Sequence, residues 1–141
     1  MKYKFIEHTA DIAVEVSANT IEDLFKVSCS AWRAAVLENI NSFSIEEKEI
    51  NLDAESLEEL LVCFLNELNF YLYAEQWIFN SVFSLKIATE NKFVRLDAKV
   101  VGEPFNKSIH HLKEEIKAVT YHQVKIQNNG DNFFTRIVFD I

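Results

Sequence analysis

In two stretches of the chain, apolar residues recur every three to four positions. The first runs from Thr20 to about Glu38, and Asn19 or Thr20 can cap its first turn. The second follows the capping-box sequence Ser56-Leu57-Glu58-Glu59 and continues to Leu72. This spacing predicts two amphipathic helices, and the second has the clearer start signal.

Elsewhere apolar and polar residues alternate with a period of two, which is typical of strands. The alternation predicts strands over residues 3–7, 12–17, 43–52, 83–87, 94–100, 115–121, 123–127 and 132–139. We expect 83–87 and 94–100 to form a hairpin that turns at Thr89-Glu90-Asn91. The charge-rich strand 43–52 is expected at a sheet edge, and residues 102–111 are expected to form a loop.

Most of the strands follow the two helices instead of alternating with them. This order favours an α+β fold, specifically a two-layer sandwich with a mainly antiparallel sheet and two main helices packed on one face. No repeat, low-complexity segment or linker divides residues 1–141, so a single domain is predicted. A chain of 141 residues is long enough to bury about 70% of its unfolded surface in a core.

Composition and net charge narrow the function. Hydrophobic residues make up 49% of the chain, no apolar run is long enough to span a membrane, and residues 1–8 lack the apolar stretch of a signal peptide. We therefore expect a cytoplasmic protein. Cys29 and Cys63 lie within helical apolar stripes, which predicts buried thiols instead of a disulfide or a zinc site.

The formal net charge of −8 argues against a protein that binds nucleic acid directly, so any RNA is expected to reach it through a partner. Acidic residues crowd the segment from Glu46 to Glu67, where Lys48 is the only basic residue. Two interpretations stay open for this segment: a solvated face, or a docking face for a basic partner.

Several common catalytic motifs are absent. The chain has no glycine-rich phosphate loop, no GxSxG, no HExxH and no CxxC. Phosphate-cradling NTPases, α/β-hydrolases, zincins and thiol redox proteins are therefore excluded.

Carboxylates at the two ends of the chain are the main candidate for chemistry. If the last strand pairs antiparallel with the strand that begins at Ile12, then Asp11, Asp140 and the α-carboxylate of Ile141 gather in one place. Two such charges about 4 Å apart repel by about 4 kcal/mol at an effective dielectric constant of about 20. The cluster would need raised pKa values or a divalent cation, and oxygen ligands suit Ca²⁺ or Mg²⁺. From spacing alone, turn or cap roles for the aspartates stay open.

Histidines and one lysine are further candidates. His8, near Asp11, could neighbour a metal or bond within its own turn. His110 and His111 would point to opposite sides of an extended segment, so they make a poor ligand pair, and His122 is expected to be semi-buried. Alternation places Lys117 opposite Ile116, Ala118 and Thr120, which fits either a solvated lysine or one that faces a phosphate or a partner.

Five sequence blocks in order resemble the archease family over essentially the whole chain. The blocks are His8-Thr9-Ala10-Asp11-Ile12, the helix segment Leu60–Leu68, Gly102-Glu103-Pro104-Phe105, the run Glu115–His122, and Val138-Phe139-Asp140-Ile141. Blocks spread from end to end are more specific than any one motif. In one departure from the family pattern, the loop after Pro104 carries a doubled histidine, which leaves open whether His110 or His111 matches the family histidine.

The resemblance implies an accessory protein, not an enzyme, that activates the RNA-splicing ligase RtcB in tRNA splicing or RNA repair. Archeases promote guanylylation and turnover of that ligase, and family members bind a divalent cation through residues that correspond to Asp11, Asp140 and Ile141. The family also ties activity to a lysine that corresponds to Lys117. Two other functions are weighed against this one: a free-standing metal-dependent phosphoester hydrolase, and a chaperone-like binding module.

Overall fold

The computed structural model describes residues 1–6, 11–38 and 45–141. Helix α1 (Ile21–Val36) begins at Thr20, whose side chain accepts a hydrogen bond from the Asp23 backbone N–H at 3.0 Å. Acidic residues in its first turn and Arg33 in its last turn complement the helix dipole. The predicted first helix is therefore confirmed, including its cap.

Helix α2 (Leu57–Ala74) begins at Ser56, whose hydroxyl accepts from the Glu59 backbone N–H at 3.1 Å. The Glu59 carboxylate reaches back and accepts from the Glu55 backbone N–H, also at 3.1 Å. This is the reciprocal arrangement that a capping box predicts, displaced by one residue on the carboxylate side. The second predicted helix is confirmed as well.

The strands form two sheets, and every strand pair among the described residues is antiparallel. The first sheet has the order β1-β2-β8-β6, with β7 also paired to β8. Its strands are β1 (Lys2–Ile6), β2 (Asp11–Ala18), β6 (Ala118–Thr120), β7 (Gln127–Asn128) and β8 (Phe133–Asp140). The second sheet has the order β3-β5-β4 and consists of β3 (Glu46–Ala54), β4 (Trp77–Glu90) and β5 (Phe93–Pro104).

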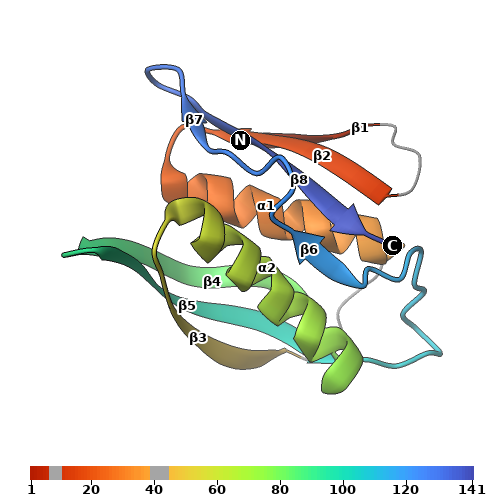
Figure 1. The fold of residues 1–141 in the computed structure, drawn as a ribbon. Coiled ribbons are helices and arrows are strands. Elements are labelled where there is room, and N and C mark those ends of the chain that lie inside the picture. The colour runs from red at the N-terminus through yellow and green to blue at the C-terminus, as the bar shows by residue number, and fades with distance from the viewer. Residues whose placement is uncertain (7–10, 39–44) are drawn as a thin grey trace.

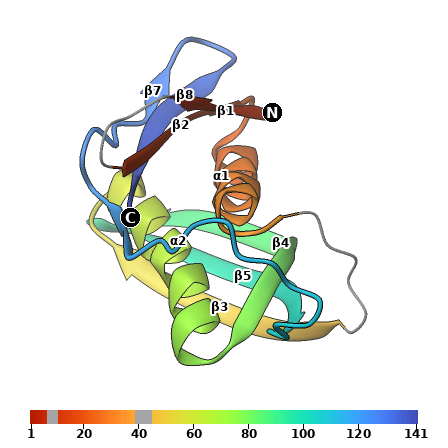
Figure 2. The same cartoon turned by 90° about the vertical axis from the view of Figure 1, so that its right-hand side faces the viewer.

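Both helices lie between these two sheets (Figures 1 and 2). Helix α1 contacts β2 on one side and β4 on the other, while α2 contacts β3, β4 and β6. The largest fully buried side chains include Trp32, Phe25, Phe64, Phe79 and Phe139. The α+β sandwich with mainly antiparallel pairing is confirmed. The period-two pattern did not indicate that the strands divide into two sheets, one on each side of the helices.

The β4–β5 hairpin is longer than predicted at both ends. The strands pair up to Glu90 and Phe93, and Asn91 opens the turn with a φ of +49°, a conformation that asparagine tolerates. Strand β5 also continues through Gly102 to Pro104, where a loop was expected. A Cβ at Gly102 would clash with the Ile78 carbonyl oxygen, so only glycine allows β4 to approach this closely.

The segment after β5 contains less strand than predicted. Residues 115–117 are not strand and β6 begins only at Ala118, while the strand predicted over 123–127 is wrong except for residue 127. Ile116 and Val119 are the buried residues here, so the predicted face of Ile116, Ala118 and Thr120 is also wrong. The alternation does not hold because side chains of α2, in place of a neighbouring strand, hydrogen-bond to this segment.

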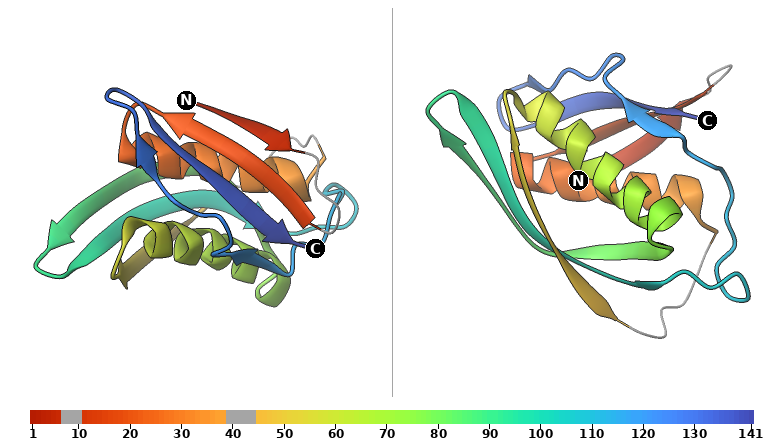
Figure 3. Two further views of the ribbon diagram at one scale, coloured as in Figure 1. Left: turned by 45° about the horizontal axis from the view of Figure 1, so that its top comes forward. Right: turned by 60° about the horizontal axis from the view of Figure 1, so that its bottom comes forward.

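Strand β8 lies beside β2 along its whole length, so the end of the chain meets the start of β2 (Figure 3). The predicted pairing of the last strand with the strand that begins at Ile12 is confirmed by the register of Ile12 with Phe139. Within the described ranges, neither helix is both long and apolar enough to cross a membrane.

Candidate metal centre

Asp11 and Asp140 are direct cross-strand partners at the end of the β2–β8 ladder. Directly opposed residues of antiparallel strands point to the same face, with Cβ atoms about 4.5–5.5 Å apart. The preceding residue, Phe139, is fully buried against the helices, so the two carboxylates lie on the outer face of the sheet. The structure therefore brings together the two aspartates that the sequence singled out.

The two aspartates differ in exposure. Asp140 is exposed, whereas Asp11 is only partly exposed and its Oδ1 oxygen is buried. On the other side of Asp140 the cross-strand partner is Ala118 of β6, which has a short side chain and is partly exposed. Ile141 follows Asp140 directly and adds main-chain oxygens at the same strand end.

The donor set of this site fits a hard cation. Among the described residues no three His, Cys, Asp or Glu side chains are grouped for metal binding, so the side-chain donors here are the two aspartates. Like charges that face each other directly across a ladder are destabilising. A divalent cation would remove that repulsion, and a set of carboxylate and main-chain oxygens is what Ca²⁺ and Mg²⁺ prefer.

Lys117 adjoins the aspartates through the backbone. Its N–H donates to the Asp140 carbonyl oxygen at 2.8 Å, which fixes the start of β6 against the end of β8. The residue is exposed, and with Phe70 and Tyr73 of α2 it borders a shallow hollow of about 460 Å³. His8, which the sequence suggested as a neighbour of the metal, lies outside the described residues.

Two asparagines of α2 hold the segment that carries Lys117. The Asn66 side chain accepts from the Val119 N–H at 2.9 Å and donates to the Val119 carbonyl at 3.0 Å, as a neighbouring strand would. Asn69 donates to the Ile116 carbonyl at 2.7 Å and accepts from the Trp32 indole N–H at 3.1 Å. These side chains take the place of the next strand at the β6 edge of the sheet.

Sequence reasoning missed both asparagines. The signal that could have found them is the pair of polar residues, three positions apart, on a helix that is otherwise mostly apolar. Asn69 is only 7% exposed, and a buried amide needs hydrogen-bond partners from elsewhere in the chain.

The remaining histidines lie in different surroundings. His110 is buried, and its Nε2 lies 3.1 Å from the Oε1 of the equally buried Glu103. The Asn106 backbone N–H donates to His110 Nδ1 at 2.8 Å, so Nε2 carries the proton and donates to Glu103. His111 and His122 are exposed, which corrects the expectation that His122 is semi-buried.

Glu103 also influences Arg33 of α1. The Arg33 guanidinium donates to the Phe79 carbonyl and to Asn80 Oδ1, both at 3.0 Å. Its pKa is lowered by burial, and the negative charge of Glu103 opposes that shift. Glu103 therefore holds the loop after β5 through His110 and acts on Arg33 of α1 through its charge.

Known proteins similar to this chain share its fold, and the matched residues include the whole candidate site. Residues 3–141 match the model of the archease protein family (MTH1598/TM1083). The chain is 34% identical to "Protein archease" of Pyrococcus abyssi, with 99% of both chains covered, and 37% identical to "Protein archease" of Thermococcus kodakarensis, with 92% and 91% covered.

Two solved structures share the fold. The solution structure of protein 1598 from Methanobacterium thermoautotrophicum superposes with a TM-score of 0.83 at 23% identity, covering 99% of this chain and 98% of that one. A crystal structure from Thermotoga maritima, titled an archease and possible chaperone, gives a TM-score of 0.64 at 29% identity, covering 98% and 96%.

Proposed function

Because this chain belongs to the archease family, we propose that it is an accessory protein that activates an RtcB-type RNA ligase. In this proposal it promotes guanylylation and turnover of the ligase in tRNA splicing or RNA repair, and it does not itself act on RNA. The site of action is the cytoplasm. The net charge of −8 supports contact with RNA only through the ligase.

The observation that carries the proposal is the direct pairing of Asp11 with the exposed Asp140 at the end of the β2–β8 ladder. These two side chains, with a main-chain oxygen of Ile141, would hold a divalent cation, either Ca²⁺ or Mg²⁺. When bound, the cation would supply positive charge for phosphate oxygens at the ligase nucleotide site. A partner can reach it there because Asp140 is exposed.

The strand pairing of this chain fixes the positions of the Asp11 and Asp140 carboxylates and of Lys117. The β2–β8 register keeps the two carboxylates opposed, and the Lys117 backbone ties β6 to the same end. The exposed Lys117 side chain is the candidate for contact with the ligase or its nucleotide. His8, which precedes Asp11 closely in sequence, is kept as a second candidate for that contact.

The experiment measures guanylylation of the cognate ligase by GTP with and without this protein. We expect Asp11→Asn and Asp140→Asn each to reduce the stimulation at least tenfold, because each removes one of the two charged side-chain donors. Asp131→Asn is the matched control, since Asp131 is an exposed aspartate outside the candidate metal centre. Full stimulation by both site variants would contradict a role for the cation, and no stimulation by the unaltered protein would contradict ligase activation itself.

A chaperone-like module is the second candidate, because the Thermotoga maritima archease has been described as a possible chaperone. Exposed aromatic side chains such as Phe70 and Phe83, 52% and 70% exposed, are the feature that favours it. Suppression of client aggregation that survives Asp11→Asn and occurs without any effect on ligation would support this candidate over ligase activation.

A further inference from the structure

A second concave site lies where the end of α2 meets the loop after β5. It has a volume of about 680 Å³, within the range of small-molecule sites. The lining is mainly apolar and aromatic, with Leu72, Tyr73, Phe105, Ile109 and Leu112 around it. The two aspartates of the candidate metal centre are not among the lining residues, so this is a separate site.

The walls of this site are fixed by hydrogen bonds. The Phe105 N–H donates to the Gln76 carbonyl at 2.7 Å, which closes the loop onto the second residue after α2. The buried Glu103–His110 pair and the bond from Asn106 N–H to His110 hold the loop from within. His110 also stacks on one face of the Phe105 ring at a centroid distance of 5.4 Å. A pre-formed cavity of this kind binds a ligand without a large ordering cost.

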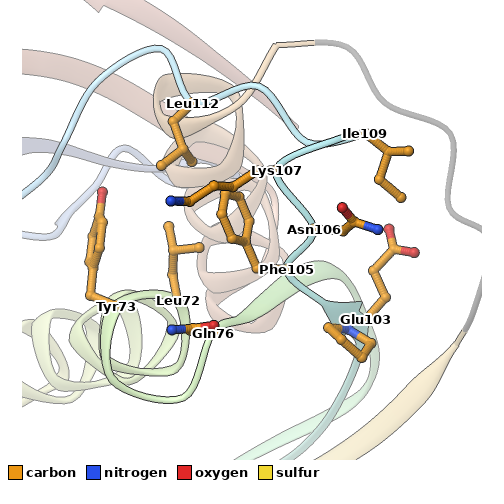
Figure 4. Close-up of a pocket in the computed structure, with 10 residues that line it drawn as sticks. Leu72, Tyr73, Gln76, Glu103, Phe105, Asn106, Lys107, Ile109 and Leu112 are labelled. Carbon is orange, nitrogen blue, oxygen red and sulfur yellow. The ribbon is translucent and has the colours of Figure 1, made fainter.

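The polar side chains of the site lie in separate places, and Glu103 and Asn106 lie on the far side of Phe105 from Tyr73 (Figure 4). In Figure 4 the Lys107 ammonium group extends into the space between Tyr73 and Phe105, level with the Tyr73 hydroxyl, while the Gln76 amide lies at the opposite end. Among the described residues Lys107 forms no ion pair within 4.0 Å. Burial raises the pKa of Tyr73, so its hydroxyl keeps its proton at neutral pH, and that oxygen already accepts from the Ile116 N–H at 3.2 Å.

We propose that this pocket binds a small molecule that combines a flat aromatic ring with an anionic group. The anion would sit at the Lys107 and Tyr73 end, where one side chain offers a positive charge and the other an O–H donor. The ring would lie over Leu72 and against Phe105, with its edge toward the Gln76 amide. Nucleoside monophosphates and simpler aryl phosphates both have this chemistry. The inference requires neither the ligase nor a bound cation.

The test is a titration of the isolated, isotopically labelled chain, followed by NMR. The probes are the four common nucleoside monophosphates, phenyl phosphate and inorganic phosphate, each in buffer without divalent cations. We expect saturable shifts of backbone amides at Leu72, Tyr73 and Phe105 with at least one ring-bearing probe, and none with inorganic phosphate. Tighter binding of a nucleotide than of phenyl phosphate would indicate that the Gln76 amide contacts the edge of the base. Equal binding would indicate that the pocket accepts any aryl anion.

Variants decide where the probe binds. Lys107→Gln should weaken binding about tenfold or more, because it removes a charge-assisted hydrogen bond. Lys125→Gln is the control, since Lys125 is exposed and does not line the pocket. Phe105→Leu keeps the apolar wall but removes the ring, and should weaken binding about fivefold. Three outcomes would overturn the proposal: no saturable binding of any ring-bearing probe, equal weakening by both lysine variants, or inorganic phosphate binding as well as the ring-bearing probes.

Discussion

Asp11 and Asp140 face each other across β2 and β8, and four residues along the same strands Glu15 and Arg136 face each other in the same way. The second pair is complementary, with Arg136 Nη2 3.4 Å from Glu15 Oε2. The first pair places two negative charges directly opposite. One ladder therefore carries an ion pair and a like-charged pair on the same face, and the like-charged pair is the one at which we propose a cation binds.

Neutralising one aspartate should stabilise the protein when no divalent cation is present. We expect Asp140→Asn to raise the free energy of unfolding by about 0.5–1 kcal/mol in chelator, because the cross-strand repulsion disappears. Addition of Ca²⁺ or Mg²⁺ at about ten times its Kd should stabilise the unaltered protein by about 1.4 kcal/mol and the variant much less. Urea unfolding with and without each cation measures both effects.

The control for this prediction is Glu15→Gln on the same ladder. It removes the attractive partner of Arg136, so stability should fall by up to about 1 kcal/mol, with or without cation. A cation response that persists in both Asp11→Asn and Asp140→Asn would place the binding site elsewhere.

Substitution of Lys117 should impair activation of the ligase without lowering the stability of the fold. Its structural bond is made by its backbone, so Lys117→Ala should change the free energy of unfolding by less than about 0.5 kcal/mol. If its side chain meets the ligase or nucleotide, stimulation of guanylylation should fall at least tenfold. Lys125→Ala, at another exposed lysine, should keep full stimulation. If Lys117→Ala stimulates the ligase as well as Lys125→Ala does, the Lys117 side chain has no role in activation and is only solvated.

What could be predicted from the sequence was mostly local. Caps at Thr20 and Ser56 mark helix starts because their partners lie three residues away. The Asp11–Asp140 pairing was predictable because antiparallel geometry puts the end of one strand beside the start of the other. The resemblance, not the spacing, supplied the ligand role of Asp11, Asp140 and Ile141, and that role stays a prediction.

The missed features depend on contacts between distant segments. The Asn66 side chain takes the place of a strand beside Val119. Val119 lies 53 positions from Asn66 in the sequence, and no local pattern predicts a contact over that distance. Likewise, the adjacent residues His110 and His111 have similar sequence surroundings. His110 turns inward because Glu103, at the end of β5, is its hydrogen-bond partner. Division of the strands into two sheets is also a property of long-range packing.

The two adjacent histidines should differ sharply in their effect on stability. His110→Ala removes the donor to Glu103 and the acceptor for the Asn106 N–H, both in buried surroundings, and should cost about 3 kcal/mol. His111→Ala changes an exposed side chain and should cost less than about 0.5 kcal/mol. Urea unfolding of the two variants measures the difference, and similar costs would contradict the inward placement of His110.

Asn66 should control the edge of β6. Asn66→Ala leaves both backbone groups of Val119 without their side-chain partner and should lower the free energy of unfolding by about 1–3 kcal/mol. Asn66→Asp keeps the acceptor for the Val119 N–H but loses the donor, so its cost should be intermediate. Amide exchange at Val119 should be fastest in the alanine variant. Equally slow exchange in all three proteins would show that Asn66 does not protect this edge.

Cys29 should make the protein less stable in alkali. Burial raises the pKa of its thiol above the ordinary value of 9.0, so the unfolded chain loses this proton at a lower pH than the folded one. A raised folded-state pKa gives stability that is fully present below the unfolded pKa and is lost as pH rises. Between about pH 9 and pH 10 the free energy of unfolding should therefore fall with a slope that approaches about 1.4 kcal/mol per pH unit. Cys29→Ala should flatten that slope, and an equally steep fall in this variant would assign the effect to another group.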